Sequence, residues 1–307
     1  MPISSNLRAA LFMVVAMASF VTNDTLTKVV METMSLSQTL LVRGVFASAL
    51  ILLVAWHRGA LAKPAQVLHP TVALRTASEM AATVTFLGAL AHMPLGNIAA
   101  MLQALPLVIT VGAALFFGEK VGWRRWLAVV IGFVGVLIIV QPGLDGFNLF
   151  SLLALASVMF AGLRDLSTRR IPGDVPTLLV SAMTAVTITF LGGIMVLAFG
   201  GWAPVPGPSL GMLGISAVLL VVGYQFIIKA MREGDISFVA PFRYTALLWA
   251  LILGFVAFGE VPDVFMIAGA TCIVLSGLYT LYRERKLDRK SKPATESTGP
   301  TMAPDGL

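Results

Sequence analysis

A duplication within the chain is the sequence feature that most constrains its fold. Asp24 and Glu119 are 95 residues apart (119 − 24), and Asp165 and Glu260 are also 95 residues apart (260 − 165). A shift of 141 positions (165 − 24) places Asp-x-x-Thr-Lys at 24–28 on Asp-x-x-Thr-Arg at 165–169, and Phe-Gly-Glu at 117–119 on Phe-Gly-Glu at 258–260. Chance rarely matches two separated clusters without a gap, so the spacing predicts two structural repeats.

The composition indicates what kind of repeat this is. Hydrophobic residues make up 58% of the 307 residues and charged residues only 12%, whereas soluble domains carry roughly 25% charged residues. Such a chain lacks the polar groups to cover a surface that faces water, so we expect an all-α membrane protein with many spans. The single cysteine, Cys272, lies in an apolar run. It excludes an intrachain disulfide and disfavours a metal cluster.

Ten apolar segments have a length suited to a transmembrane helix, which needs about 20 residues. In the first half they are 9–30, 37–56, 71–91, 96–117 and 123–140, and in the second half 150–168, 177–199, 210–229, 236–258 and 264–281. We therefore predict two five-helix repeats over 8–141 and 148–282, followed by a disordered basic cytoplasmic tail over 283–307.

The positions of Lys and Arg predict the orientation. If the N-terminus is cytoplasmic, all of the 21 Lys and Arg residues except Lys28, Arg43 and Arg243 fall in inner loops, inner helix ends or the tail. This one-sided distribution satisfies the positive-inside rule. Both termini are then cytoplasmic, and the net charge of +6 reflects topology, so we expect no nucleic-acid partner.

A repeat of five helices is an odd number of crossings, so the second copy enters the membrane with the opposite orientation. Inverted-topology repeats are the architecture of secondary transporters, which bind their substrate near the bilayer midplane between the repeats. We therefore look for function at the interface of the two halves.

The segment 236–258 departs most from a passive anchor. Pro241 and Arg243 lie inside it. A proline within a spanning helix needs neighbours that satisfy the freed carbonyl group, and an arginine there needs protein, water or an opposite charge around it. The pattern predicts a broken helix that faces the inside of the bundle.

These features resemble the drug/metabolite transporter superfamily, in its ten-helix branch with paired EamA-type repeats. The resemblance rests on two five-helix halves, each ending its fourth helix with Gly-Glu, and covers about residues 7–282. Asn-Asp-x-x-x-Lys at 23–28, Arg43 and Ala-Pro-Phe-Arg-Tyr at 240–244 resemble a bacterial subgroup of riboflavin and S-adenosylmethionine importers. The resemblance implies transport of a small organic metabolite.

Polar residues within the spans are the candidate contacts to cargo. Arginines would hold carbonyl or anionic groups by forked hydrogen bonds, and buried amides need partners that a cargo can supply. The alternative for each is a structural role, by reaching toward headgroups or by fixing helix packing. The candidate cargo-binding residues are Asn23, Arg43, Glu79, Gln103, Gln225, Arg243 and Tyr244.

A second group is predicted to act in coupling or gating. Arg75 and Glu79 are spaced i, i+4 and could pair; burial disfavours the charged carboxylate while a nearby arginine favours it, as a proton-coupling site requires. The pairs Asp24–Lys28 and Asp165–Arg169 could form latches at opposite ends, or could simply anchor helix ends. The coupling or gating candidates are Asp24, Lys28, Asp165, Arg169 and Pro241. Glu119 and Glu260 are expected to cap helices or pair with loop bases.

The remaining expectations are mostly exclusions. The sequence has no P-loop for ATP-driven transport, and no histidine pair at metal-ligand spacing, so we expect neither an enzyme nor a cofactor or metal. The expected partners are a small-molecule cargo, the lipid bilayer and, as candidate coupling ion, the proton; a monomer and a homodimer are both open.

For function, the sequence favours an inner-membrane carrier that works by alternating access, with riboflavin uptake first. The alternatives are S-adenosylmethionine uptake, amino-acid or drug export by the same fold, and a transporter-like sensor or assembly protein without flux.

Overall fold

The computed structural model describes residues 5–61, 64–119, 121–141, 148–172, 174–200, 202–233 and 236–291. Every regular element among these residues is a helix. The first half contains α1 (Ser5–Met31), α2 (Leu36–His57), the 3-10 helix η1 (Pro64–Leu68), α3 (Pro70–Leu90), α4 (Leu95–Leu102), α5 (Leu105–Phe117) and α6 (Trp123–Val140). The second half contains α7 (Leu149–Thr168), α8 (Thr177–Phe199), α9 (Gly207–Glu233), α10 (Ile236–Val239), the 3-10 helix η2 (Ala240–Tyr244), α11 (Thr245–Phe258) and α12 (Val264–Ser291).

Nine helical stretches of the described chain are long and apolar enough to cross a membrane, with α4 and α5 taken together as one stretch. The sequence predicted ten. The tenth, α3, has 21 residues, but Arg75, Thr76, Ser78 and Glu79 make its first half polar. α3 packs against α7 and α8, so its polar residues lie between helices.

Two stretches are broken near the same relative position. The predicted break in 236–258 is present: Pro241 lies in η2, which separates α10 from α11. The prediction of one continuous helix over 96–117 is wrong, because the chain breaks at Gln103 and Ala104, between α4 and α5. Pro106 has no N–H with which to bond the carbonyl group four residues earlier, and the N–H of Ala104 instead bonds the carbonyl of Met101 at 3.0 Å.

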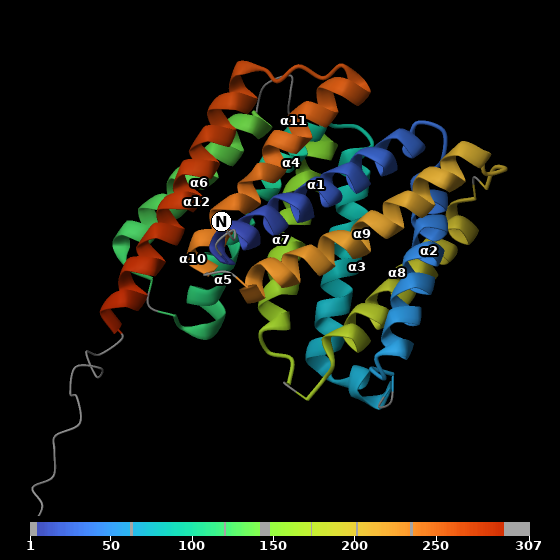
Figure 1. Cartoon of the computed structure of the whole chain (residues 1–307). Helices are drawn as coiled ribbons and strands as arrows, with labels where there is room; N and C mark the ends of the chain where they lie inside the picture. The colour runs from blue at the N-terminus through green and yellow to red at the C-terminus, as the bar shows by residue number, and fades with distance from the viewer. Residues whose placement is uncertain are drawn as a thin grey trace, which may run out of the picture.

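The two halves do not form separate bundles, because each of the main helix pairs joins a helix of the first half to one of the second. α1 pairs with α9, α3 with α7, α2 with α8 and α6 with α12, and Figure 1 shows α1 and α9 crossing the front of the molecule. A shift of 141 residues converts the first pair into the second and leaves the other two unchanged. Ser48 and Thr189, which are 141 residues apart, share a hydrogen bond of 2.8 Å between α2 and α8, as an approximate two-fold axis requires.

The C-terminal segment differs from the prediction of a disordered tail over 283–307. α12 continues to Ser291, because Arg, Glu, Lys and Leu, which dominate 283–290, all have high helix propensity. The rest of the predicted tail, 292–307, lies outside the described residues.

Close packing of α2 on α8 predicts a sensitive glycine. A methyl group at Gly192 would lie 2.7 Å from the backbone nitrogen of Leu41, whereas one at Gly211 would meet nothing within 4 Å. Because overpacking costs about 1–3 kcal/mol, Gly192→Ala should lower the thermal unfolding midpoint of the purified protein in detergent. Gly211→Ala, the matched control, should leave it unchanged or raise it. Equal midpoints for the two variants would contradict the α2–α8 contact.

Candidate functional site

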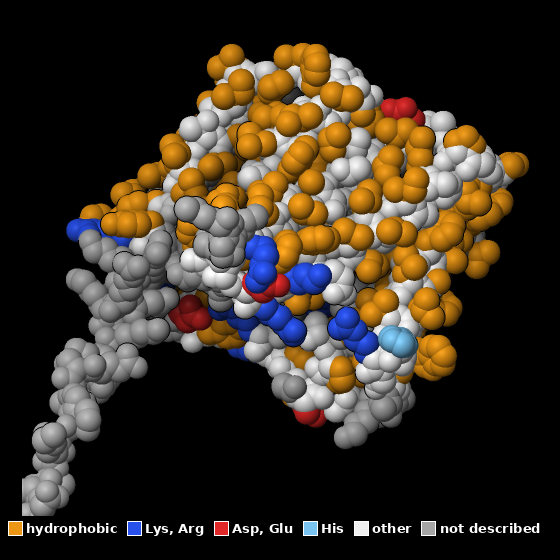
Figure 2. Space-filling model, viewed as in Figure 1, with side chains coloured by type: hydrophobic (Ala, Val, Ile, Leu, Met, Phe, Trp, Pro, Cys, Tyr) orange, Lys and Arg blue, Asp and Glu red, His pale blue; other side chains and the backbone are white. Residues whose placement is uncertain are grey.

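The bundle has two chemically different ends. Helices α1, α3, α6, α8 and α10 start at one end, which we call the basic end, and α2, α5, α7, α9 and α12 finish there (Figure 1). Figure 2 shows Lys and Arg side chains gathered in the lower part of the visible face, while hydrophobic side chains cover its upper part. Arg8 and Glu233 form an ion pair of 2.8 Å at the basic end, between α1 and α9.

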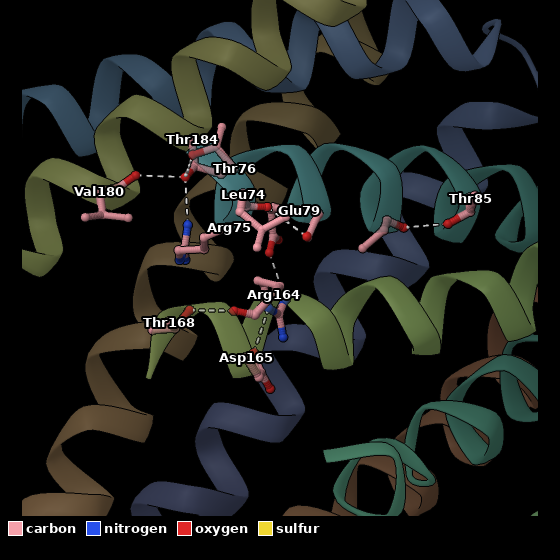
Figure 3. A network of polar contacts seen from close by, with 12 residues as sticks. Leu74, Arg75, Thr76, Glu79, Thr85, Arg164, Asp165, Thr168, Val180 and Thr184 are labelled. Atoms are coloured by element: carbon pink, nitrogen blue, oxygen red, sulfur yellow. Dashed lines mark hydrogen bonds and ion pairs between the residues drawn. The ribbon is translucent and has the colours of Figure 1, made fainter. Parts of the chain in front are cut away.

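An ion-pair network links α3 to α7 within the bundle. Arg164 donates from Nη1 to the Glu79 carboxylate at 2.9 Å and from Nε to Asp165 at 2.7 Å. Arg75 donates instead to the Thr184 hydroxyl of α8 at 2.7 Å. Figure 3 shows Arg164 between the two carboxylates, with Arg75 turned toward α8. The predicted Arg75–Glu79 pair is therefore wrong, because a charge on the neighbouring helix takes the carboxylate.

The equivalent contact between α1 and α9 is neutral. Asn23 is buried, with 2% of its surface exposed, and its Oδ1 accepts a hydrogen bond of 2.6 Å from Ser216. Its amide nitrogen donates to Asp24 at 2.8 Å. Asn23 therefore fixes helix packing and holds the Asp24 carboxylate beside it.

Two further ion pairs connect the repeats, one at each end. Lys28 of α1 pairs with Glu260, after α11, at the end opposite the basic end. Arg169, after α7, pairs with Glu119, after α5, at 3.3 Å at the basic end. The predicted latches Asp24–Lys28 and Asp165–Arg169 are wrong in their partners, since Asp165 pairs with Arg164. Both basic residues instead reach a glutamate of the other repeat.

A cavity of about 210 Å³ opens between α5, η2 and α12. Gln103, Arg243 and Tyr244 line it together, and it extends to Glu119 and Arg169 at the basic end. The hydroxyl of Tyr244 is buried and has no hydrogen-bond partner among the described residues. Buried polar groups normally have partners, and this hydroxyl, which lies against Gly277 of α12 in the cavity wall, has none among the described residues.

The two helix breaks place these side chains. Gln103 lies at the α4–α5 break, and Arg243 and Tyr244 lie in η2. A shift of 141 residues carries Gln103 onto Tyr244, so equivalent positions of both repeats meet in one cavity. Apolar side chains of α5 and polar side chains from both repeats line it together, a combination that can bind a small polar molecule.

The other predicted site residues lie elsewhere. Gln225 is half-buried on α9 and does not line this cavity. Asn23, Arg43 and Glu79 belong to the polar contacts between α1, α2, α3, α7 and α9, outside the cavity lining. Pro241 creates the turn that positions Arg243. No group of three His, Cys, Asp or Glu side chains in the described chain is arranged to bind a metal ion.

Sequence reasoning missed Arg164, and assigned only structural roles to Glu119 and Glu260. One signal could have found Arg164: a shift of 141 places it on Asn23, so each repeat carries a hydrogen-bond donor directly before its aspartate. The predicted sidedness could have paired Lys28 with Glu260, because both were expected at the outer surface.

Comparison with known proteins shows which family the chain is similar to. The sequence profile of the EamA-like transporter family matches residues 7–141 and 148–282. A riboflavin transporter of Rhizobium johnstonii is 31% identical over 201 residues, 66% of each chain, and a riboflavin transporter of Vibrio cholerae is 33% identical over 210 residues, 67% of this chain and 70% of the relative. An S-adenosylmethionine uptake transporter of Rickettsia felis is 28% identical over 189 residues, 60% of this chain and 62% of the relative.

The architecture also occurs in a solved structure, titled only "Crystal structure of protein". It matches with a TM-score of 0.65 and 15% identity, over 90% of this chain and 97% of the other. The sequence matches span about two thirds of the length of the curated relatives. The membrane-capable helices and the transporter relatives identify a multi-pass protein of the bacterial inner membrane.

The network in Figure 3 predicts that Arg164 matters more for stability than Arg75. Arg164→Gln leaves the Glu79 and Asp165 carboxylates without their basic partner, and breaking a buried pair costs about 3–5 kcal/mol. Arg75→Gln removes one hydrogen bond to a hydroxyl, which costs about 1.5–3 kcal/mol. The thermal unfolding midpoint in detergent should therefore fall further for Arg164→Gln than for Arg75→Gln.

The double variant Arg164→Gln with Glu79→Gln should recover part of the loss, because one of the two unpaired charges is gone. If the double variant is less stable than Arg164→Gln alone, Glu79 does not depend on Arg164.

Proposed function

The chain belongs to the EamA-like transporter family, and on this premise we propose that it is a secondary transporter that takes up riboflavin across the inner membrane by alternating access. The observation that carries the proposal is the cavity in which Gln103, Arg243 and Tyr244 converge. Riboflavin transporters from two bacteria are 31% and 33% identical to this chain, which supports flavin as the cargo.

The topology of the proposed carrier has ten crossings, with α3 as the tenth. α3 has the length to cross, since 21 residues at 1.5 Å each reach about 31 Å. Its polar first half is tolerable because it faces α7 and α8 instead of lipid. The basic end is cytoplasmic by the positive-inside rule, so both ends of the chain lie inside, with repeats over 8–141 and 148–282.

The chemistry of the cavity favours riboflavin over S-adenosylmethionine. Gln103, Arg243 and Tyr244 all offer hydrogen-bond donors, and riboflavin is an uncharged flavin whose ring carries carbonyl oxygens and nitrogens that accept them. Three arginines and one carboxylate, Glu119, line the cavity, so its basic side chains outnumber its acidic one. This excess of positive charge disfavours a sulfonium cation, which carboxylates or an aromatic cage would bind. S-adenosylmethionine uptake stays the alternative because a relative with that activity is 28% identical.

Protons are the proposed coupling ion, and Glu79 is the proposed carrier. Its carboxylate lies between α3 and α7 with 18% of the side chain exposed, and Arg164 is the basic partner that it would release on protonation. Glu79 lies outside the cavity lining, so proton and cargo would occupy different places, linked through the packing of α5 on α7.

The cargo proposal predicts a graded loss of uptake from two neighbouring residues. Arg243→Ala removes a charged donor, whose hydrogen bonds contribute about 1.5–3 kcal/mol, so apparent affinity should fall about 10-fold to 100-fold. Tyr244→Phe removes a neutral donor and should cost about 2-fold to 10-fold. Uptake of labelled riboflavin, and growth of a riboflavin-auxotrophic bacterium on low external riboflavin, measure both.

Arg124→Ala is the matched control, because this arginine stacks on Trp123 and does not line the cavity. It should transport normally. Absence of rescue by the wild-type protein, with the protein shown in the membrane, would exclude riboflavin uptake. Normal uptake by Arg243→Ala would leave the function standing and exclude this cavity. Riboflavin binding without flux in proteoliposomes would favour a sensor.

A further inference from the structure

Glu119 and Glu260 are placed by the same local structure in each repeat. α5 ends at Gly118 and α11 ends at Gly259, and both glycines adopt the left-handed conformation, with φ of 65° and 66°. Glycine reaches this region without the steric cost that other residues have, and it terminates helices in this way. The turn brings the N–H of each glutamate back onto its own helix, to Ala113 and Gly254 respectively. Each glutamate therefore projects from an equivalent, rigid corner.

At the end opposite the basic end, Glu260 joins three parts of the bundle. One carboxylate oxygen binds Lys28 of α1, and the other accepts a hydrogen bond of 2.7 Å from the N–H of Leu95, where α4 starts. Lys28 also donates to the carbonyl of Met93 at 2.7 Å. The side chains of Lys28 and Glu260 are only 12% and 20% exposed. This group of contacts closes α1 and α4 onto the end of α11.

The equivalent contact at the basic end is loose. Arg169 and Glu119 are 3.3 Å apart, and their side chains are 53% and 51% exposed. They occupy the positions equivalent to Lys28 and Glu260 after a shift of 141 residues. The same pair is thus formed and buried at one end, and solvated at the other.

The cavities next to the two ion pairs also differ, in volume and in how far they extend. Ala113 and Glu119 line the cavity of about 210 Å³ at the basic end, and their equivalents Gly254 and Glu260 line one of about 130 Å³ at the other end. The larger cavity reaches Gln103, at the break between α4 and α5. The smaller one stops short of both helix breaks. The cargo cavity therefore extends to the basic end, and the two cavities share no lining residue.

We propose that Glu119 and Glu260 are the gate residues of this transporter, each closing one end of the cargo path with the basic residue of the opposite repeat. This inference rests on the proposed alternating access. When the repeats exchange conformations, Lys28–Glu260 opens and Arg169–Glu119 becomes buried. Because one pair forms as its equivalent breaks, the two states stay close in energy.

Cysteine accessibility tests the gates without any cargo. With the native cysteine removed by Cys272→Ser, Asn97→Cys reports on the smaller cavity and Thr110→Cys on the larger one. A membrane-impermeant maleimide is applied to whole cells for the first and to inside-out vesicles for the second. Glu260→Gln should increase labelling at 97 several-fold and decrease labelling at 110. Glu119→Gln should decrease labelling at 97 and leave labelling at 110 high.

Opposite effects of the two glutamates at position 97 are the decisive result, because general loosening of the fold would raise labelling in both variants. The exchange Lys28→Glu with Glu260→Lys should restore wild-type labelling. Glu233→Gln, which breaks the Arg8–Glu233 pair between α1 and α9, is the matched control and should change neither site. The gate proposal is wrong if labelling at position 97 changes in the same direction for Glu119→Gln and Glu260→Gln, or changes in neither variant.

Labelling and uptake together distinguish the gate proposal from the riboflavin proposal. Labelling as expected, together with no riboflavin uptake, keeps the gates and removes riboflavin. Normal riboflavin uptake, together with unchanged labelling in both glutamate variants, keeps the function and removes the gates.

Discussion

Lipid supplies no hydrogen-bond partners, and this constraint decides where the chain can depart from a regular helix. Irregular backbone at membrane depth survives only where protein or a water-filled cavity satisfies it. Each repeat uses one such departure, at Gln103–Ala104 in the first half and at Ala240–Tyr244 in the second. Residues of both breaks line one cavity, where Gln103 of the first half lies near Arg243 and Tyr244 of the second. The duplicated break builds the site.

The sequence predicted most of the fold because hydropathy and the duplication act over many residues at once. The outer ends of the predicted segments lie within a few residues of the observed ones, apart from the end of α12, which runs on into polar residues. The break at Gln103 was not predicted, because the segment 96–117 carries no charged residue that would mark an irregular, inward-facing stretch. Its equivalent was predicted because Pro241 and Arg243 stand together. Pro106 itself, at the middle of the predicted segment 96–117, was the available signal.

The ion pairs show where local rules stop. Pairing at i, i+4 stabilises a helix by only about 0.2–0.5 kcal/mol, whereas a charge buried between helices costs several kcal/mol unless it has a partner. Packing between helices therefore decides the partner, and Glu79 pairs with Arg164 of α7 instead of Arg75. The same reasoning explains why Lys28 reaches Glu260 from the other repeat. Knowing the partners requires knowing which helices touch. Local spacing does not carry that information, whereas the two-fold relation between the repeats and the sidedness of the charges carry part of it.

The two repeats are similar in backbone but differ in side chains. These differences give the α3–α7 contact and the equivalent α1–α9 contact different chemistry. The α3–α7 contact holds Glu79 and Arg164, while the equivalent positions of α1 and α9 are Leu220 and Asn23. Proton binding at Glu79 would weaken one interface and leave the other, joined by Asn23 and Ser216, unchanged. A carrier whose two halves responded equally to protons would gain no preference for either state. A carboxylate in one interface only would let proton binding favour one of the two states.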